Sequence, residues 1–349
     1  MYTRKILPPR AAPVENGIPV QGTWDRAFEE VDLLDIRRPY RVPLPRWFRD
    51  GRIKEWECLG IQDERFMLEA FLANVKLYRL AQVFLFDKES RERFVFRKLI
   101  PGTGWTLPRS LSNASVESRS FHFFFRIHNW LDADTIKLDL NIEAARRRPA
   151  LTVHLAYDMN PRDVTPMAVS LNFDGRRAMY AFKALAAVRG DMVFGGRHIR
   201  LDPERCSGFF CDYKGFFPYR LRTTVCSATG FDGEGRRFGF HLAENQTRET
   251  FKNNENALWV DGKLTPLPPV RITMPGGPES GWIIQDLEGM VDLVFTPKEP
   301  NRAGARLLFT SAEFDVPMGL YNGMLVSADG VEIQAHNLWG MGEKLYLRV

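Results

Sequence analysis

The sequence has little cysteine and no long apolar run. Its 349 residues include only four cysteines, at positions 58, 206, 211 and 226, and no two of them are spaced as C-x-x-C. Because the six histidines are also scattered, the usual zinc-ligand patterns are missing, and we expect no metal site and free thiols. The N-terminal segment is too polar for a signal peptide, and no stretch approaches the roughly 18 apolar residues of a membrane-spanning helix. The sequence therefore predicts a cytoplasmic protein without a transmembrane segment.

An excess of one charge sign is also lacking. Lysine and arginine number 48 against 43 aspartates and glutamates, a net charge of +5, and the basic residues are spread along the chain. The one dense basic run, ARRRP at 145–149, precedes a proline and is interpreted as a solvated turn, with contact to an anionic surface as the alternative. Without a concentrated basic stripe or a recognition helix, we expect no nucleic-acid partner.

Cofactor motifs are missing as well. The chain has no βαβ rhythm, no glycine-rich phosphate loop and no nucleophile elbow, which disfavours Rossmann and hydrolase folds and predicts no cofactor. What is abundant is phenylalanine, with 26 copies, in segments where apolar and polar residues alternate, such as 65–75, 79–88 and 118–130. The pairs Asp261-Gly262 and Asp329-Gly330 are typical of tight hairpin turns, because glycine accepts the positive φ that such turns need.

This alternation predicts an all-β chain of about eighteen strands in up-and-down order. We expect two antiparallel lipocalin-like barrels, or deep sandwiches, in tandem, with few short helices. The N-terminal barrel-like domain is predicted at 1–175 and the C-terminal one at 176–349. Residues 177–188 fit either a strand or a short helix, and the stretch DPERCSGFFCD at 202–212 fits one helical turn with Asp202 as its N-cap and Pro203 at the first helical position.

Several stretches of the C-terminal half resemble the bacterial family catalogued as domain of unknown function 2804. They are CDYKGFFPYRLRTTVCSATGF, NENALWVDGKLTPLPPV, GWIIQDLEGMVDLVFTP, LYNGMLVSADGVEI and NLWGMGEK. The family is in turn distantly similar to tandem lipocalin-like proteins, which include carotenoid 1,2-hydratase and fungal pericyclase-type cyclases. That resemblance implies a fold that binds long apolar molecules, and in some members acid–base chemistry without a cofactor.

Three functions follow as hypotheses. The first is binding of a long apolar small molecule such as a lipid or isoprenoid, which the phenylalanine excess and the predicted barrels favour. The second is a cofactor-independent hydratase, isomerase or cyclase acting on such a molecule through a buried carboxylate. The third is a carbohydrate-binding or carbohydrate-active β-protein, which would need paired carboxylates in a groove. The sequence does not determine the oligomeric state.

The candidate catalytic residues are Glu255, Asp212 and His241. Glu255 is the first choice as proton donor, since a carboxyl among apolar side chains has its pKa raised by desolvation. The alternative is that the asparagine-rich loop around Glu255 only satisfies its own backbone. Asp212 is expected to pair with a nearby arginine, and His241 to act as a general base. The candidate ligand-binding residues are aromatic, amide and charged side chains of the C-terminal half, namely Tyr219, Arg222, Asn245, Asn256, Trp259, Trp282, Trp339 and Glu343.

Overall fold

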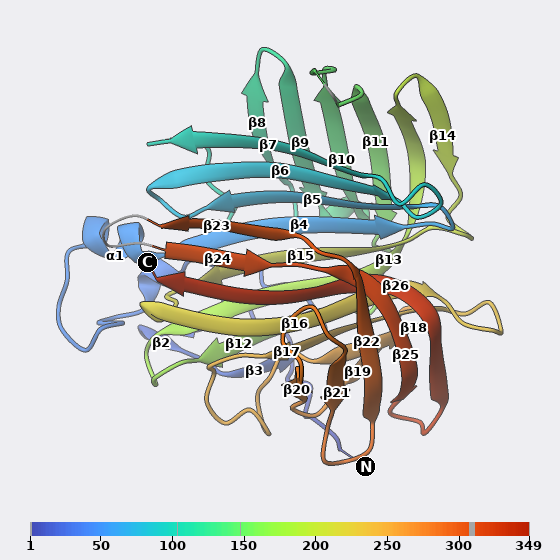
Figure 1. Ribbon diagram of the computed structural model, residues 1–349. Helices are drawn as coiled ribbons and strands as arrows, with labels where there is room; N and C mark the ends of the chain where they lie inside the picture. The colour runs from blue at the N-terminus through green and yellow to red at the C-terminus, as the bar shows by residue number, and fades with distance from the viewer. Residues whose placement is uncertain (1, 103, 147, 307–310, 349) are drawn as a thin grey trace.

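The computed structural model of the chain describes residues 2–102, 104–146, 148–306 and 311–348. Two large antiparallel sheets, each curled into a half-barrel, make up the molecule (Figure 1). Within the described residues there is one α-helix, α1 (Arg46–Arg52), besides the short 3-10 helices η1 (Leu33–Asp35) and η2 (Leu131–Ala133). The predicted all-β fold class is confirmed. No helix among the described residues is long and apolar enough to cross a membrane.

The first sheet has thirteen strands, hydrogen-bonded along the path β7-β6-β5-β4-β15-β13-β11-β10-β9-β8. Its strands are β3 (Gly22–Trp24), β4 (Lys54–Gln62), β5 (Phe66–Asn74), β6 (Tyr78–Asp87), β7 (Arg93–Pro101), β8 (Ala114–Ser120), β9 (Phe123–Trp130), β10 (Thr135–Ile142), β11 (Leu151–Asp158), β12 (Met167–Asn172), β13 (Ala178–Phe194), β14 (Arg197–Leu201) and β15 (Ser207–Gly215). A separate small hairpin, β1 (Val14–Glu15) and β2 (Ile18–Pro19), precedes it.

The second sheet has eleven strands. Nine follow the path β19-β18-β17-β16-β26-β25-β22-β21-β20, while β24 pairs with β26 and β23 pairs with β24. Its strands are β16 (Arg220–Phe231), β17 (Arg237–Glu244), β18 (Ala257–Val260), β19 (Lys263–Pro266), β20 (Arg271–Thr273), β21 (Trp282–Gln285), β22 (Val291–Glu299), β23 (Arg302–Arg306), β24 (Ser311–Asp315), β25 (Met318–Val326) and β26 (Glu332–Arg348).

Local sequence signals account for several of these elements. The Asp261-Gly262 turn joins β18 to β19 with φ angles of 46° and 76°, as its sequence predicts. Residues 177–188 belong to β13, so the strand forms and the alternative helix does not. Residues 202–206 make one hydrogen-bonded turn, closed by the Cys206 N–H on the Asp202 carbonyl, with no helix beyond it. All four cysteines are free thiols.

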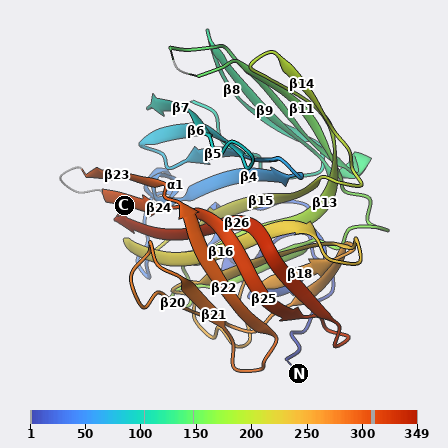
Figure 2. The ribbon, with the colours of Figure 1, turned by 45° about the vertical axis from the view of Figure 1, so that its right-hand side comes forward.

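The three largest of four apolar clusters show where the core lies. One fills the first half-barrel, with Phe125 and Tyr157 among its members, and another fills the second half-barrel around Trp282. The third lies between the two sheets and includes Met179 of the first and Leu221 of the second. Strands β4 and β5 of the first sheet lie alongside β16 and β26 of the second, as Figures 1 and 2 both show. Central strands are therefore buried on both faces.

The change from one sheet to the other comes between Gly215 and Arg220, where β15 ends and β16 begins. The predicted domain boundary at residue 175 lies in the turn between β12 and β13, which both belong to the first sheet. The division into two domains at that residue stays a prediction.

Candidate functional site

A cavity of about 240 Å³ lies between the two sheets. Its walls come from β4, β5, β6 and β15 on one side and from β16, β17 and β26 on the other. Most of the wall is apolar, with side chains that include Trp56, Met67, Phe71, Phe84, Phe209, Phe217, Leu221, Phe314, Met341 and Leu345. A few polar groups interrupt it, the titratable ones being Lys54, Cys58, Glu69, Tyr78, Cys211, Tyr213, His241, Glu255 and Glu343. An apolar cavity with few convergent polar groups is the usual form of a small-molecule site.

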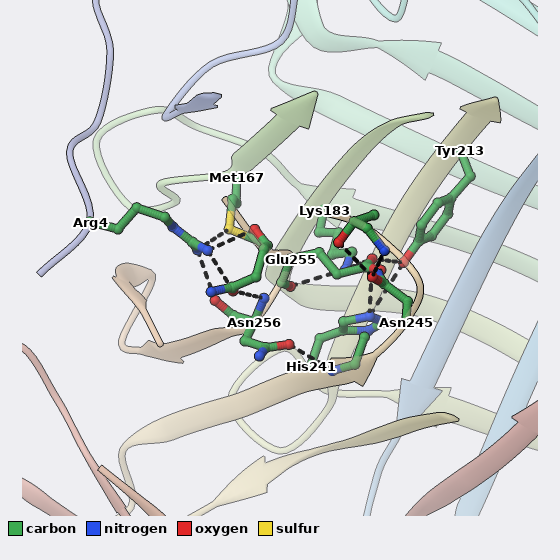
Figure 3. Close-up of polar contacts among 11 residues, drawn as sticks. Arg4, Met167, Lys183, Tyr213, His241, Asn245, Glu255 and Asn256 are labelled. Atoms are coloured by element: carbon green, nitrogen blue, oxygen red, sulfur yellow. Dashed lines mark hydrogen bonds and ion pairs between the residues drawn. The ribbon is translucent and has the colours of Figure 1, made fainter. Parts of the chain in front are cut away.

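The carboxylate of Glu255 receives hydrogen bonds from three side chains (Figure 3). Lys183 Nζ of β13 lies 2.6 Å from Oε2, and the Tyr213 hydroxyl of β15 donates to the same oxygen at 2.8 Å. Asn245 Nδ2 donates to Oε1 at 2.6 Å. Burial alone would raise the pKa of Glu255, but the Lys183 ammonium and the neighbouring donors outweigh it and hold the pKa well below its usual value. This carboxylate is therefore ionised and accepts hydrogen bonds, which does not fit the predicted role of proton donor.

The loop that carries Glu255 is fixed from both sides. Arg4, from the N-terminal segment, donates to the Asn254 carbonyl at 2.7 Å and to the Asn256 carbonyl at 3.0 Å. Asn254 Oδ1 accepts the backbone N–H of Asn256, and Asn256 Oδ1 accepts that of Ala243 on β17. The asparagines thus satisfy buried backbone groups and aim Glu255 at the first sheet.

His241 lies on β17 beside the same carboxylate. Its Nε2 is 3.3 Å from the Tyr213 hydroxyl and 3.6 Å from Glu255 Oε2. Burial, with the positive charge of Lys183, lowers the pKa of His241 to about 4. The imidazole is therefore neutral at pH 7 and can accept a proton. We call Lys183, Tyr213, His241, Asn245 and Glu255 the Glu255 cluster.

Two more carboxyl groups face the cavity, Glu69 on β5 and Glu343 on β26. Burial raises the pKa of Glu343 to about 7, and the charges of Glu69 and Glu255 add to the effect. Burial also raises the pKa of Glu69, whose Oε1 accepts a hydrogen bond from Cys58 Sγ at 3.1 Å. The cavity thus combines an ionised carboxylate (Glu255), a neutral imidazole (His241) and a carboxyl that keeps its proton up to about neutral pH (Glu343). Groups of these kinds serve as general acids and bases in catalysis.

The family model for the domain of unknown function DUF2804 matches residues 13–348. The chain belongs to this family. No curated protein matches it. Among solved structures, it is similar to kievitone hydratase from Nectria haematococca, with a TM-score of 0.47, 13% identity and coverage of 84% of this chain and 88% of that chain. It is also similar to CghA, with a TM-score of 0.49, 12% identity and the same coverage of each chain.

In this DUF2804 protein, four of the predicted site residues line one cavity: His241, Asn245, Glu255 and Glu343. Asn256 lies next to them and supports the loop. Asp212 does not join them. It points into the first half-barrel, where it pairs with Lys214 at 2.6 Å rather than with an arginine, so the predicted partner is wrong. Its neighbour Tyr213 faces the cavity instead, because successive side chains of a strand point to opposite faces.

The remaining predicted ligand-binding residues lie outside the cavity wall. Trp259 is fully buried and donates its indole N–H to the Thr165 carbonyl, and Trp282 is buried in the core of the second half-barrel. Trp339 packs on Phe86, with ring centroids 5.1 Å apart. Tyr219 is 45% exposed, and the exposed Arg222 stacks over Tyr346. These three tryptophans therefore fill apolar contacts and offer no exposed platform to a sugar ring.

Sequence reasoning missed Lys183, Tyr213, Glu69 and Arg4. Lys183 stands alone in the apolar stretch YAFKALAAV, and Glu69 alone in MLEAFLANV. A single charge inside an apolar strand is the signal that could have found both, because a buried charge needs a partner. Within the described residues, no group of three or more His, Cys, Asp or Glu side chains is arranged to hold a metal ion.

Proposed function

We propose that this DUF2804 protein binds a mainly apolar small molecule between its two sheets and transfers protons to and from it without a cofactor. The observation that carries the proposal is that Glu343, whose pKa burial raises to about 7, and His241, whose pKa burial lowers to about 4, line the same apolar cavity. The reaction class is addition of water to a carbon–carbon double bond, its reverse, or isomerisation of such a bond.

The apolar wall of the cavity supports this substrate class. Trp56, Phe71, Phe84 and Phe209 contribute aromatic surface, and Met67 adds an adaptable thioether. The binding free energy then comes mainly from removing apolar surface from water, with the few polar groups fixing orientation. A flat or extended unsaturated molecule with one polar end, such as an isoprenoid or a polyketide-like enone, fits this lining.

In the hydration direction the atoms balance as follows. The π electrons of the double bond take the carboxyl proton of Glu343 to form a C–H bond on one carbon. The oxygen of a water molecule bonds to the other carbon, and His241 accepts the proton that this water loses. The product carries one added water. Exchange with solvent then returns a proton to Glu343 and removes one from His241. The ionised Glu255 stabilises the transient imidazolium, while Lys183 and Tyr213 hold Glu255 in place.

Deuterium incorporation tests the proposal without a known substrate. The purified protein is incubated in heavy water with pools of unsaturated isoprenoids and enones, and the products are analysed by mass spectrometry. We expect wild-type protein to add deuterium, or one water, to a member of the pool, and Glu343→Gln and His241→Asn to lose at least about a hundredfold in rate. Glu332→Gln, an exposed glutamate on the same strand as Glu343, is the matched control and should keep full rate.

Native mass spectrometry of the purified protein separates binding from conversion. If the wild type retains a small molecule but exchanges no hydrogen on it beyond the level of Glu343→Gln, catalysis is ruled out and binding alone remains. If nothing from the pools binds, the substrate class is wrong.

A further inference from the structure

The segment from Arg37 to Arg52 carries an unusual surface. It contains six arginines and one aspartate, so these sixteen residues hold as much net positive charge as the whole chain. Helix α1 lies within it and buries none of its own residues. Figure 1 shows α1 standing out at one end of the sheets. Because prolines and aromatics separate the arginines, the sequence shows no dense basic run here.

Large apolar side chains are exposed on the same segment. Trp47 is 75% exposed, Phe48 41% and Val42 50%, and the rings of Trp47 and Phe48 contact each other with centroids 5.9 Å apart. Leu77, in the turn between β5 and β6, is 67% exposed. That turn is held next to α1 by the Lys76–Asp50 ion pair of 3.0 Å. The four exposed apolar side chains thus lie on the 37–52 segment and on the turn that is ion-paired to it.

Exposed arginines surround this apolar tip, although Arg49 donates to the Leu34 and Ile36 carbonyls. Arg38 and Arg41 are exposed, and both have positive φ angles, 53° and 66°, where glycine or asparagine would fit with less strain. Arg37, Arg38 and Arg49 also border an open pocket beside Asn16. Arg46 remains 54% exposed although it pairs with Asp32.

We infer that this tip, residues 41–48 with Leu77, docks the protein on an anionic phospholipid surface. Tryptophan and phenylalanine enter the boundary between headgroups and acyl chains, while arginines bind lipid phosphates. Charge complementarity selects a lipid surface over a second copy of this chain, because two such tips would repel each other. The occupant is therefore a bilayer that contains acidic lipid.

The tip lies at one end of the apolar cavity. Lys54 begins β4 directly after α1, and its ammonium donates to the Gly51 carbonyl at 3.1 Å. Lys54, Val75 and Tyr78 also line the cavity. Docking would thus bring the cavity close to apolar molecules dissolved in the bilayer. The docking itself does not depend on the chemistry proposed for the cavity.

Vesicle co-sedimentation tests the inference. Wild-type protein should sediment with vesicles of phosphatidylcholine plus phosphatidylserine, bind much less to phosphatidylcholine alone, and lose binding as salt rises. Trp47→Ser/Phe48→Ser and Arg38→Glu/Arg41→Glu should each weaken binding at least about tenfold. The matched controls are Phe121→Ser, a 90% exposed aromatic in the turn between β8 and β9, and Arg162→Glu/Arg197→Glu, two exposed arginines whose replacement changes net charge equally. Both controls should bind like wild type.

Fluorescence gives a second readout. Brominated lipids should quench part of the wild-type tryptophan emission, and Trp47→Phe should bind vesicles but lose this quenching. Glu343→Gln should dock like wild type, which separates this proposal from that for the cavity. Failure of wild-type protein to sediment with the acidic vesicles, or equal binding by the tip variants and their controls, would overturn the inference. Self-association that Trp47→Ser/Phe48→Ser abolishes, with no vesicle binding, would overturn it in favour of a second copy.

Discussion

At the scale of single residues, the Lys183–Glu255 ion pair joins the two sheets. Its side chains are 0% and 5% exposed, and the residues are 72 positions apart in the chain. Burial lowers the pKa of Lys183, whereas the negative charge of Glu255 raises it. A buried pair of this kind need not add net stability, but a buried charge left without its partner is costly.

Replacing only one partner of the pair should therefore lower the free energy of unfolding more than replacing both. We expect Lys183→Met to lower the free energy of unfolding by about 3–5 kcal/mol at pH 7. The double variant Lys183→Met/Glu255→Gln should recover most of that loss, because neither charge of the pair is left without its partner. Urea unfolding of the wild type, both single variants and the double variant measures the coupling. A double variant as unstable as Lys183→Met would show that packing, not charge, explains the loss.

The carboxyl of Glu343 should make stability depend on pH. Its pKa rises from 4.5 to about 7 on folding, so between these values the folded state holds a proton that the unfolded state has released. Stability therefore falls as pH rises through this window, by as much as about 3 kcal/mol. We expect Glu343→Gln to lack this contribution and to gain stability relative to wild type between pH 5 and pH 8. The free energy of unfolding is measured in urea as a function of pH. If it changes with pH in the same way for wild type and Glu343→Gln, the raised pKa of Glu343 is wrong.

At the scale of elements, the β18–β19 hairpin shows how a local turn serves a distant contact. Gly262 has a φ of 76°, and a Cβ there would lie 1.6 Å from the carbonyl oxygen of Asp163. The backbone of this turn also bonds the connection between β11 and β12 of the first sheet, since the Thr165 N–H donates to the Gly262 carbonyl at 2.8 Å. The turn is thus both a hairpin signal and a junction between the sheets.

Gly262→Ala should accordingly lower the free energy of unfolding by more than a substitution at a positive-φ glycine usually does. We expect a loss of at least about 2 kcal/mol, from backbone strain together with displacement of the 163–165 segment. Gly233→Ala is the control, because a Cβ at that glycine meets nothing within 4 Å and its φ is not positive. Thermal unfolding of the two variants provides the comparison, and equal melting temperatures would contradict the expectation.

At the scale of the whole molecule, the two half-barrels share a buried boundary. The apolar cluster between the sheets combines residues from both, including Met179 and Tyr213 with Leu221 and Leu345. The Glu255 cluster adds polar contacts across the same boundary. Neither half can unfold without exposing this surface of the other.

We therefore expect the protein to unfold in a single calorimetric transition, with the van't Hoff enthalpy equal to the calorimetric enthalpy. Differential scanning calorimetry makes the measurement, and Lys183→Met should lower the melting temperature without splitting the peak. Two resolved peaks in the wild type would mean that the half-barrels are independent domains.

The sequence by itself determined the all-β class, the antiparallel pairing and the sharp turns, because alternation of side chains and positive-φ glycines are local properties. It predicted about eighteen strands in up-and-down order, whereas the described residues form 26 strands, with β4 paired to β15 and β16 to β26. It also pointed to Glu255, His241, Asn245 and Glu343. The sequence could not show whether Asp212 or Tyr213 faces the cavity. Strand β15 is buried on both faces, and only the packing of the second sheet decides which face meets the cavity. For the same reason Lys183 was not paired with Glu255, and Glu255 was assigned as an acid although a cation keeps it ionised. Which faces meet, and hence which charges become partners, was decided only by the tertiary structure.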